Sequence, residues 1–212
     1  MKTNVRTFPN SDFEENLYLV WRDGSSACVV IDPGLEPFDA IRFIESNSLV
    51  PETILITHGH YDHIGGIEAF CQKWPNIEIL VGEKERFKLT DPMGNLSGHF
   101  GFPVTTRDAT RTLADGQEFT AAGIAFKAIL IPGHSSGHLV FQLSGAVPPT
   151  VFVGDVIFAG SVGRTDFPDG DTDALISGIK SQLMTLPGDT VLYPGHGPAT
   201  IVSDERNTNP WL

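Results

Sequence analysis

The sequence predicts an α/β protein organised as a layered sandwich, with helices on the outer faces of β-sheets. Short apolar runs that lack alternation and are rich in Val and Ile recur along the 212 residues, as in strands that are buried on both faces. Amphipathic helical patterns lie between these runs, so strands and helices follow one another in mixed order. Several runs also end in a His or an Asp, which places these polar residues at one edge of the sheets.

The expected strands are runs dominated by aliphatic and β-branched side chains. In chain order they cover residues 17–22, 27–31, 53–57, 77–81, 119–120, 124–131, 138–143, 151–153 and 191–193. Two of these runs resemble each other, because Ile54 to His58 and Ile129 to His134 both lead from aliphatic residues into a histidine. The repetition indicates a fold with two halves.

Helices are expected where apolar residues recur with a period near 3.6. They cover residues 37–47, 65–73, 83–89 and 172–185. The pattern of the last range is the clearest, because its apolar residues repeat on one face. Asp171 or Thr172 can cap its N-terminus, and Pro187-Gly188 follows its end.

Length and composition favour one domain over residues 1–212. The chain is 41% hydrophobic and contains no low-complexity tract that reads as a linker. Polar residues interrupt the first 15 positions, where a signal peptide needs an unbroken apolar stretch. No run approaches the roughly 18 apolar residues of a membrane-spanning helix. We therefore expect a cytoplasmic protein that does not associate with membranes.

Charge and cysteine content narrow the classes of partner. The formal net charge is -12, which repels the phosphates of nucleic acids and of anionic membranes. Cys28 and Cys71 are the two cysteines, and they lie in apolar patterns rather than in a metal-binding spacing. We expect buried, reduced thiols. A metal site in this protein is thus predicted to be free of sulfur, and a small molecule is the expected substrate.

The stretch with the most potential metal ligands is His-Gly-His-Tyr-Asp-His at residues 58–63. It places four potential ligands in six positions, directly after an expected strand. Neutral imidazoles bind zinc and iron, and a carboxylate compensates charge. One small cation rarely takes four ligands from a single tight turn. Adjacent ligands that point in different directions therefore indicate two metal ions about 4 Å apart.

Further potential ligands follow later strands. His134, Asp155 and His196 each come after an apolar run, and a glycine precedes each of them. Loops at one edge of the sheets lie close together, so we expect these side chains beside residues 58–63. A carboxylate such as Asp155 can share two oxygens between two cations, whereas a neutral imidazole has one lone pair to donate.

Several motifs resemble, in order and spacing, those of the metallo-β-lactamase fold family. They are Thr57 to Gly66, Gly133-His134, Gly154-Asp155 and Gly195-His196. The loop at 163–168 and the Pro-Gly-His-Gly-Pro stretch at 194–198 look like the short hydroxyacylglutathione hydrolases, also called type II glyoxalase II-like proteins. The resemblance covers nearly the whole chain. It implies an αββα sandwich of two mixed sheets flanked by helices, without the C-terminal helical domain with which longer glyoxalase II enzymes bind glutathione.

The resemblance also implies a ligand set for two divalent metal ions. The first ion would be held by His58, His60 and His134. The second would be held by Asp62, His63 and His196, with Asp155 as the bridge between the ions. We expect zinc, with iron or manganese as alternatives that suit the same ligands. Asp62 and Asp155 would act in catalysis as well as in metal binding.

Two residues outside the ligand set are expected to support it. Asp32 lies in an Asp-Pro-Gly turn after an apolar run, and it could orient a ligand histidine through the ring N–H. His138 lies four residues after His134. It is expected to be a supporting histidine rather than a ligand, because histidines around metal sites commonly serve in this way.

Substrate contacts are expected from two other segments. Longer glyoxalase II enzymes carry, at the position of Arg164, a basic residue that contacts glutathione, so Arg164 is a candidate substrate-binding residue. Asp166 stands where those enzymes have a tyrosine, and it could pair with Arg164 instead. His99 lies in a Gly-rich segment, residues 94–102, which is typical of a surface loop and could border the substrate site.

These residues together predict a hydrolytic reaction. Two divalent cations would lower the pKa of a shared water towards ~7 and polarise a carbonyl group, so a metal-bridging hydroxide is the expected nucleophile. A thiol of pKa ~8.5 leaves without help from a general acid, which favours a thioester over a β-lactam, whose leaving nitrogen needs a proton. The resemblance therefore implies a metal-dependent hydrolase of thioesters such as S-lactoylglutathione or another glutathione conjugate.

Two other functions are compatible with the same residues. Persulfide dioxygenases share the fold, and their single iron would map to His58, His134 and Asp155, a facial triad with open positions for oxygen. His196 within Pro-Gly-His-Gly-Pro favours the hydrolase over this oxygenase. A non-catalytic metal-binding module is the third alternative, although all seven ligand positions are filled. The metal, the acyl group, the thiol carrier and the oligomeric state stay open at the level of sequence.

Overall fold

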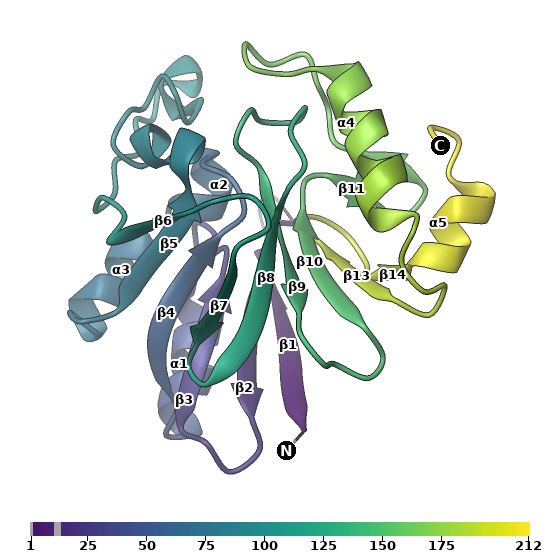
Figure 1. Ribbon diagram of the computed structural model, residues 1–212. Helices are drawn as coiled ribbons and strands as arrows, with labels where there is room; N and C mark the ends of the chain where they lie inside the picture. Colours follow the sequence, from purple (N-terminus) through teal and green to yellow (C-terminus); the bar gives the residue numbers. More distant parts are fainter. Residues whose placement is uncertain (1, 11–13) are drawn as a thin grey trace.

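The computed structural model describes residues 2–10 and 14–212, which form two six-stranded β-sheets packed against each other (Figure 1). The strand order of the first sheet follows the sequence. It is β1 (Thr3–Pro9), β2 (Asn16–Arg22), β3 (Ala27–Ile31), β4 (Val50–Ile56), β5 (Glu78–Gly82) and β6 (Arg111–Leu113). Strands β1 to β3 pair antiparallel, and β3 to β6 pair parallel, so the sheet is mixed.

The second sheet uses the C-terminal half of the chain. Its order is β14 (Thr200–Ile201), β13 (Val191–Pro194), β10 (Thr150–Gly154), β9 (Leu139–Leu143), β8 (Ile124–Leu130) and β7 (Glu118–Ala121). A small hairpin, β11 (Ile157–Phe158) and β12 (Ser161–Val162), follows β10. Strand β10 pairs parallel with β13, and the other pairs in this sheet are antiparallel. The second sheet is therefore also mixed.

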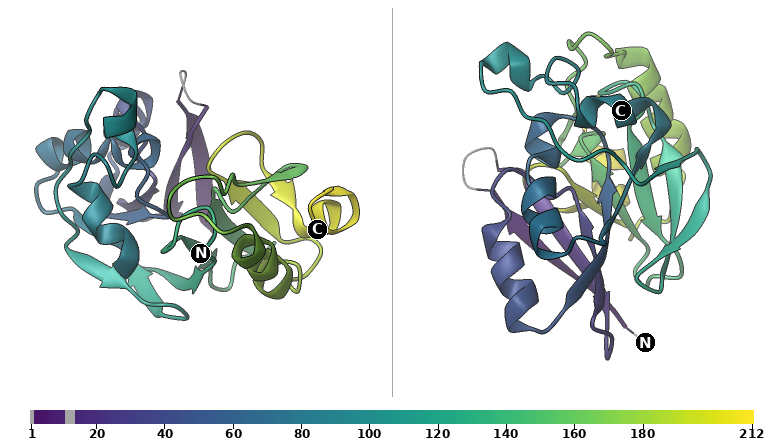
Figure 2. Two further views of the ribbon diagram at one scale, coloured as in Figure 1. Left: turned by 90° about the horizontal axis from the view of Figure 1, so that it is seen from above. Right: turned by 90° about the vertical axis from the view of Figure 1, so that its left-hand side faces the viewer.

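Helices cover the outer face of each sheet, as the view from above shows (Figure 2). On the first sheet lie α1 (Phe38–Ser46) and α3 (Ile67–Lys73), preceded by the single turn α2 (Tyr61–Ile64). On the second lie α4 (Thr172–Gly178), with its π-helical continuation Ile179–Leu183, and α5 (Val202–Thr208). Parallel strands require such crossovers, which is why α1 links β3 to β4.

Three apolar layers hold this αββα sandwich together. One lies between the first sheet and its helices, one between the two sheets, and one between the second sheet and its helices. Strand β2 shows how the layers arise, because Leu19 joins the outer layer and the adjacent Val20 joins the central one. Side chains alternate across a strand, so a strand buried on both faces has a continuous apolar run.

The predicted fold class, an αββα sandwich of two mixed sheets, is confirmed, and the expected strands all form. The expected helices at residues 37–47 and 172–185 also form, whereas the helix expected at 65–73 is shorter and begins at Ile67. The expected α-helix at 83–89 is wrong in type, because Glu83–Leu89 is a 3-10 helix. In the described parts of the chain, no helix has both the length and the apolar character needed to cross a membrane.

Several elements were not expected from the sequence. They are β1, β6, β11, β12, β14, α2, α5 and the short 3-10 helix Ser97–Phe100. Strand β1 lies at the edge of its sheet and its residues are half-buried or exposed, so its sequence lacks the apolar run that marked the central strands. The other unexpected strands are only two or three residues long, which leaves too few positions for a periodic pattern.

Candidate metal centre

The candidate ligands lie where strands of both sheets end. His58 and His60 follow β4, and Asp62 and His63 lie on α2 directly beyond them. Strands β8, β10 and β13 run in the same direction, because β9 is antiparallel to both β8 and β10, and β10 is parallel to β13. Their C-terminal ends therefore share one edge. The structure brings all seven predicted residues together there: His58, His60, Asp62, His63, His134, Asp155 and His196.

Three histidine nitrogens meet at the centre of this edge. Nε2 of His58 lies 3.0 Å from Nδ1 of His60, and Nε2 of His134 lies 3.2 Å and 3.0 Å from these two atoms. Each nitrogen of a neutral imidazole either donates or accepts. Among three mutually close nitrogens at least two must have the same role, so hydrogen bonds alone do not account for the triangle.

A small cation accounts for this geometry. Zinc binds histidine nitrogens at about 2.0–2.1 Å in tetrahedral sites, which separates two ligand nitrogens by roughly 3.4 Å. The observed separations of 3.0 to 3.2 Å are close to that value. The three histidine side chains are buried, so their lone pairs are not directed into bulk water. The donor set therefore fits a metal ion.

A second group of potential ligands adjoins the first. Nε2 of His196 lies 3.4 Å from Oδ2 of Asp62, and Nε2 of His63 lies 3.9 Å from the same oxygen. Asp155 lies between the groups, because its Oδ1 is 3.4 Å from Nε2 of His63 and its Oδ2 is 3.6 Å from Nε2 of both His134 and His196. A carboxylate in this place can serve two cations at once.

Unsatisfied polar atoms also indicate where cations would bind. Within the described residues, Nε2 of His63 and Oδ1 of Asp155 are buried and make no hydrogen bond, although they face each other. A buried polar group without a partner is costly, and a cation between the two atoms would satisfy both. His58 also groups with His63 and Asp155. The His and Asp clusters are thus consistent with a binuclear metal site.

Asp32 orients two of the histidine rings. Its Oδ2 accepts hydrogen bonds from Oγ1 of Thr57 at 2.6 Å and from Nδ1 of His63 at 3.1 Å. The Thr57 hydroxyl donates to Asp32, so it accepts the bond from Nδ1 of His58 at 3.1 Å. Both rings consequently carry their proton on Nδ1, which leaves the Nε2 lone pair directed at the centre.

His134 and His138 are fixed by the backbone. Nδ1 of His134 donates to the carbonyl oxygen of Arg164 at 2.9 Å, which leaves its Nε2 free to bind a metal. Nε2 of His138 instead accepts a hydrogen bond from the backbone N–H of Asp155 at 3.1 Å. The His138 ring is buried and stacks on His58 with centroids 4.7 Å apart. His138 therefore lies behind the ligands and positions Asp155.

Burial and charge divide the histidines into two types. Burial, followed by the proximity of other histidines, lowers the pKa of His58 and His60 well below its usual range, which favours the neutral, metal-binding form. Burial acts in the same direction on His63, but Asp155 and Asp62 outweigh it and raise its pKa. Burial opposes ionisation of Asp155, yet His63 and its neighbours hold the pKa of Asp155 far below its usual range. The second group therefore attracts positive charge.

Two glycines allow the ligand loops to approach each other. Gly154 has a φ of +48°, and a Cβ there would lie 2.5 Å from Oγ1 of Thr57. A Cβ on Gly195 would lie 2.2 Å from Oδ1 of Asp155. Larger residues would push Asp155 or His196 out of place. This requirement explains why glycine precedes both ligands in the sequence.

The N-terminal segment holds the loop that carries His196. Nδ2 of Asn16 donates to the carbonyl oxygens of Pro194 and Gly197 at 3.0 and 2.8 Å, and the Tyr18 hydroxyl donates to that of Pro194 at 2.5 Å. Glu15 forms a β-bridge with His196 and is buried, and in the described residues its carboxylate oxygens have no hydrogen-bond partner. Burial raises the pKa of Glu15 well above its usual range.

A buried ionic network beside the centre was not predicted from the sequence. Nζ of Lys88, in the 3-10 helix, lies 3.0 Å from Oε2 of Glu85, 2.7 Å from Oδ2 of Asp169 and 2.5 Å from Oγ of Ser135. The Lys88 side chain is only 2% exposed and that of Glu85 is fully buried. Buried charges of this kind persist only when they are paired.

This network joins three loops of the centre. Glu85 accepts hydrogen bonds from the backbone of Gly59 at 2.9 Å and of Gly137 at 2.7 Å. Asp169 accepts one from the backbone of Ser136 at 3.0 Å. Gly59 lies between His58 and His60, and Ser136 and Gly137 lie between His134 and His138. The network therefore fixes the loops on which the histidine triangle depends.

Five of the candidate ligands line an open cavity of about 430 Å³, whereas His58 and His63 do not: the five are His60, Asp62, His134, Asp155 and His196. Arg164 lines this cavity, but Asp166 binds its guanidinium through both carboxylate oxygens, at 2.7 and 2.6 Å, and the Arg164 side chain stacks on Phe167 at 4.4 Å. His99 is exposed and does not line the cavity, whereas Leu96 and Phe100 on the same segment do. The segment borders the cavity, as expected, through residues other than His99.

Comparison with known proteins gives the family of the chain. Residues 11–196 match the family described as the metallo-beta-lactamase superfamily. The chain belongs to the metallo-β-lactamase superfamily. It is 35% identical to the hydroxyacylglutathione hydrolase GloC of Haemophilus influenzae over 212 residues, which cover 99% of this chain and 98% of that protein.

Solved structures of the superfamily extend this comparison. The BLEG-1 B3 metallo-β-lactamase is 33% identical and superposes with a TM-score of 0.93 over 99% of both chains. The protein TTHA1623, solved in a di-iron-bound form, is 32% identical with a TM-score of 0.85, over 98% of this chain and 100% of that one. The chain is accordingly a metallo-hydrolase of the metallo-β-lactamase superfamily with a His-rich metal site.

Proposed function

We propose that the protein is a metal-dependent thioester hydrolase of the hydroxyacylglutathione hydrolase type. The observation that carries the proposal is the convergence of seven His and Asp side chains, five of which line one cavity. The 35% identity to a hydroxyacylglutathione hydrolase over 99% of the chain supports the substrate class. S-lactoylglutathione is the reference substrate, and a small-molecule thioester is the only partner that this proposal requires.

The proposed ligands follow the two groups in the structure. His58, His60 and His134 would hold one ion, and Asp62, His63 and His196 the other, with Asp155 as the bridge. Zinc, iron and manganese all suit these ligands, and the di-iron form of TTHA1623 supports iron as well as zinc. Two such cations would supply a water that ionises near neutral pH and a positive charge for a carbonyl oxygen.

The protein's own residues would orient and deprotonate the reactants. Asp62 lines the cavity and its Oδ2 lies 3.4 Å from Nε2 of His196. This carboxylate can hold the attacking water beside the reacting carbonyl and accept a proton from it. A thiolate then leaves without a proton, because its conjugate acid has a pKa of about 8.5. Asp155 would fix the position of the two ligand groups relative to each other, because its carboxylate lies between them.

Two further residues would position the ligands and one would contact the substrate. We assign Asp32 to the orientation of His58 and His63, and His138 to the placement of the Asp155 backbone, from the hydrogen bonds described above. Arg164 lines the cavity and is the proposed contact for a polar part of the substrate. Its pairing with Asp166 weakens that contact, since one guanidinium fork cannot fully bind two carboxylates.

We also propose a single domain in the cytoplasm. Residues from both sheets share the central apolar layer, so the two halves would not separate without exposing it. Cys28 and Cys71 are free and buried, which suits a reducing compartment.

The test is thiol release by the purified chain loaded with zinc, iron or manganese. We expect about two metal ions per chain by elemental analysis and metal-dependent release from S-lactoylglutathione or a related thioester. No release from any thioester of a panel would contradict the proposal. Oxygen uptake with glutathione persulfide would favour the iron dioxygenase instead, and metal binding without turnover of either substrate would favour a non-catalytic module.

A second candidate activity is β-lactam hydrolysis. The similarity to the BLEG-1 B3 metallo-β-lactamase, with a TM-score of 0.93, favours it. Cleavage of the amide must deliver a proton to the leaving nitrogen, and Asp62 and Asp155 are the carboxylates that line the cavity among the described residues. A chromogenic cephalosporin assay on the same metal-loaded protein decides between the two. We expect kcat/KM for the thioester to exceed that for the cephalosporin.

A further inference from the structure

One side of the cavity carries the proposed metal ligands, and the other side is apolar. Its residues, apart from the proposed ligands and Arg164, are mainly aromatic and aliphatic. They include Tyr61, Leu96, Phe100, Phe158, Val162 and Phe167. A cavity with convergent polar groups at its base and apolar walls is typical of a small-molecule site. The walls, rather than the base, must therefore select among substrates.

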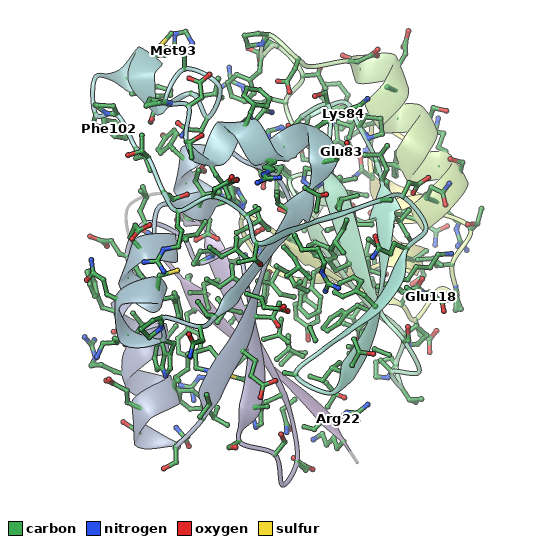
Figure 3. The ribbon with its side chains drawn as sticks, turned by 60° about the vertical axis from the view of Figure 1, so that its left-hand side comes forward. Arg22, Glu83, Lys84, Met93, Phe102 and Glu118 are labelled. Atoms are coloured by element: carbon green, nitrogen blue, oxygen red, sulfur yellow. The ribbon has the colours of Figure 1, made fainter. Side chains whose placement is uncertain are left out.

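Two of these rings, Tyr61 and Phe100, form a continuous surface with Phe102 just outside the cavity, and we call these three rings the aromatic strip. Tyr61 contacts Phe100 with ring centroids 5.6 Å apart and Phe102 at 5.3 Å, and Phe100 and Phe102 stack at 6.1 Å. Tyr61 immediately precedes Asp62 in the sequence. Figure 3 shows Phe102 and Met93 on the segment that extends past the sheets.

The outer rings of the strip are open to solvent. Phe100 is 58% exposed and Phe102 is 44% exposed. Single exposed aromatic residues are common, but contiguous ones beside a site mark a binding surface. Contact with an apolar group would remove these rings from water, which gives about 25 cal/mol per Å² of buried apolar surface.

The segment that carries the strip is held in place before any substrate binds. Asn95 is fully buried, and its Nδ2 donates to the carbonyl oxygens of Lys88 and Val104 at 2.9 Å each. The backbone N–H of Tyr61 donates to the carbonyl oxygen of Asn95 at 3.1 Å. These bonds close the loop from 88 to 104 on itself and join it to α2. A preformed surface loses less entropy on binding than a mobile one.

Charged side chains can contribute little to the selection of substrates in this cavity. Of the described residues that line the cavity, Arg164 is the one Lys or Arg, and Asp166 occupies its guanidinium. The part of a substrate that lies outside the metal centre therefore meets aromatic rings and a charge that is already paired.

We propose that the aromatic strip is the subsite for an apolar acyl group. The inference rests on the proposed thioester hydrolysis and names its substrate class: thioesters whose acyl group is an aliphatic chain of about four to six carbons or an aromatic ring. The acyl group and the sulfur are both bonded to the reacting carbonyl, and we assign the acyl group to the strip because the strip offers aromatic rings and no charge, whereas glutathione carries charged groups that are costly to bury without partners. The thiol carrier would then extend away from the strip.

The experiment compares acyl groups on one thiol. Metal-loaded full-length protein is assayed with the acetyl, butanoyl, hexanoyl and phenylacetyl thioesters of glutathione, with lactoyl as the polar reference. We expect kcat/KM to rise about two- to fourfold per added methylene from acetyl to hexanoyl. Lactoyl should fall below butanoyl. A matched series with acetyl held constant and the thiol lengthened should show no such rise.

Variants of the strip test its role directly. Phe100→Ala should lower kcat/KM for hexanoyl about five- to tenfold and for acetyl by less than about twofold. Phe100→Leu keeps apolar area and should retain most of the dependence on chain length. The matched control is Phe38→Ala, because Phe38 on α1 is 57% exposed, like Phe100, and does not line this cavity. It should leave the whole series unchanged.

The possible failures are distinguishable. If no thioester is cleaved, acetyl included, the proposed function is wrong. If all are cleaved at equal kcat/KM, or Phe100→Ala and Phe38→Ala give the same dependence on chain length, the subsite is wrong although hydrolysis stands. A dependence confined to the thiol series would likewise overturn the assignment to the acyl group.

Discussion

The two sides of the cavity are built on different principles. One side carries the candidate ligands, which are buried or half-buried, and most of the histidine rings are fixed by a second hydrogen bond. The other side is more exposed, with Phe100 at 58% and the Arg164 side chain at 61%, although Tyr61 and Leu96 are buried. The first side lies at sheet edges, and the second lies mainly on the segments 96–102 and 158–167, which include the hairpin β11–β12.

This difference indicates that the residues for the reaction and the residues that select the substrate lie in different parts of the site. Groups that stabilise charge in a reaction must be fixed beforehand, since their reorganisation would cost free energy during the reaction. Groups that select a substrate can lie on loops, which tolerate substitution without loss of the fold. We therefore expect substitutions in the buried side to affect metal binding, activity or stability strongly, and substitutions in the exposed side to change substrate preference by small factors.

The largest effect is expected at Asp155. Asp155→Ala removes the carboxylate between the two ligand groups, so thiol release should fall about a thousandfold or more. Elemental analysis should show fewer than two metal ions per chain. Asp108→Ala is the control, because Asp108 is a surface carboxylate paired with Arg86. Equal metal content and activity in the two variants would show that Asp155 is no ligand.

The next effect concerns stability. Lys88→Met leaves Glu85 buried without its cation, and the loss of one partner from a buried ion pair costs about 3–5 kcal/mol. Urea unfolding of the metal-free protein measures this. Lys84→Met is the matched control, since Lys84 is exposed on the same 3-10 helix (Figure 3). A free energy of unfolding that is the same for both variants would mean that the network does not stabilise the fold.

A pH-dependent effect is expected at Glu15. Because burial raises the folded-state pKa of Glu15 above the unfolded value of about 4.3, the folded state binds the proton more tightly, and stability falls as pH rises above that value. The slope reaches at most about 1.4 kcal/mol per pH unit. Glu15→Gln removes this loss, so metal-free Glu15→Gln should gain stability over the natural chain between pH 5 and 8.

The control for Glu15 is its neighbour. Glu14 is exposed, so Glu14→Gln should follow the natural chain at every pH. Thermal unfolding in chelator at several pH values provides the measurement. A difference between Glu15→Gln and the natural chain that does not grow with pH would contradict the raised pKa.

The smallest effect is expected in the exposed side. Asp166→Asn releases the guanidinium of Arg164, so kcat/KM for a thioester with a carboxylated thiol carrier should rise about two- to fivefold at low salt. An uncharged carrier should show no change. Asp39→Asn removes a comparable surface pair with Arg42 on α1 and should alter neither. An equal rise with both carriers would show that charge at Arg164 is not the cause.

The sequence predicted the buried side better than the exposed side. His134, Asp155 and His196 could be found because each follows an apolar run, and the topology carries such positions to one edge. Lys88 could not, because a lysine in a short polar helical pattern is ordinarily solvated. Glu85 lies one turn away on the same 3-10 helix, but only the tertiary structure buries this pair and brings Asp169 to it.

The same limit applies to the loops. The Gly-rich segment at 94–102 was expected to border the substrate site; it borders the cavity beside the candidate ligands through Leu96 and Phe100, whereas His99 is exposed and does not line it. Left-handed backbone at Leu96 and Gly101 sets which side chains turn inward. Such local geometry has no periodic pattern in sequence, so the side-chain directions could not be predicted.

The spacing of the ligands along the chain orders the assembly of the centre. The histidine triangle is complete in sequence at His134, whereas the second group requires His196, close to the C-terminus. The first group therefore does not depend on β13 for its residues, whereas the second does. Closing the second group spans a longer segment and costs somewhat more chain entropy.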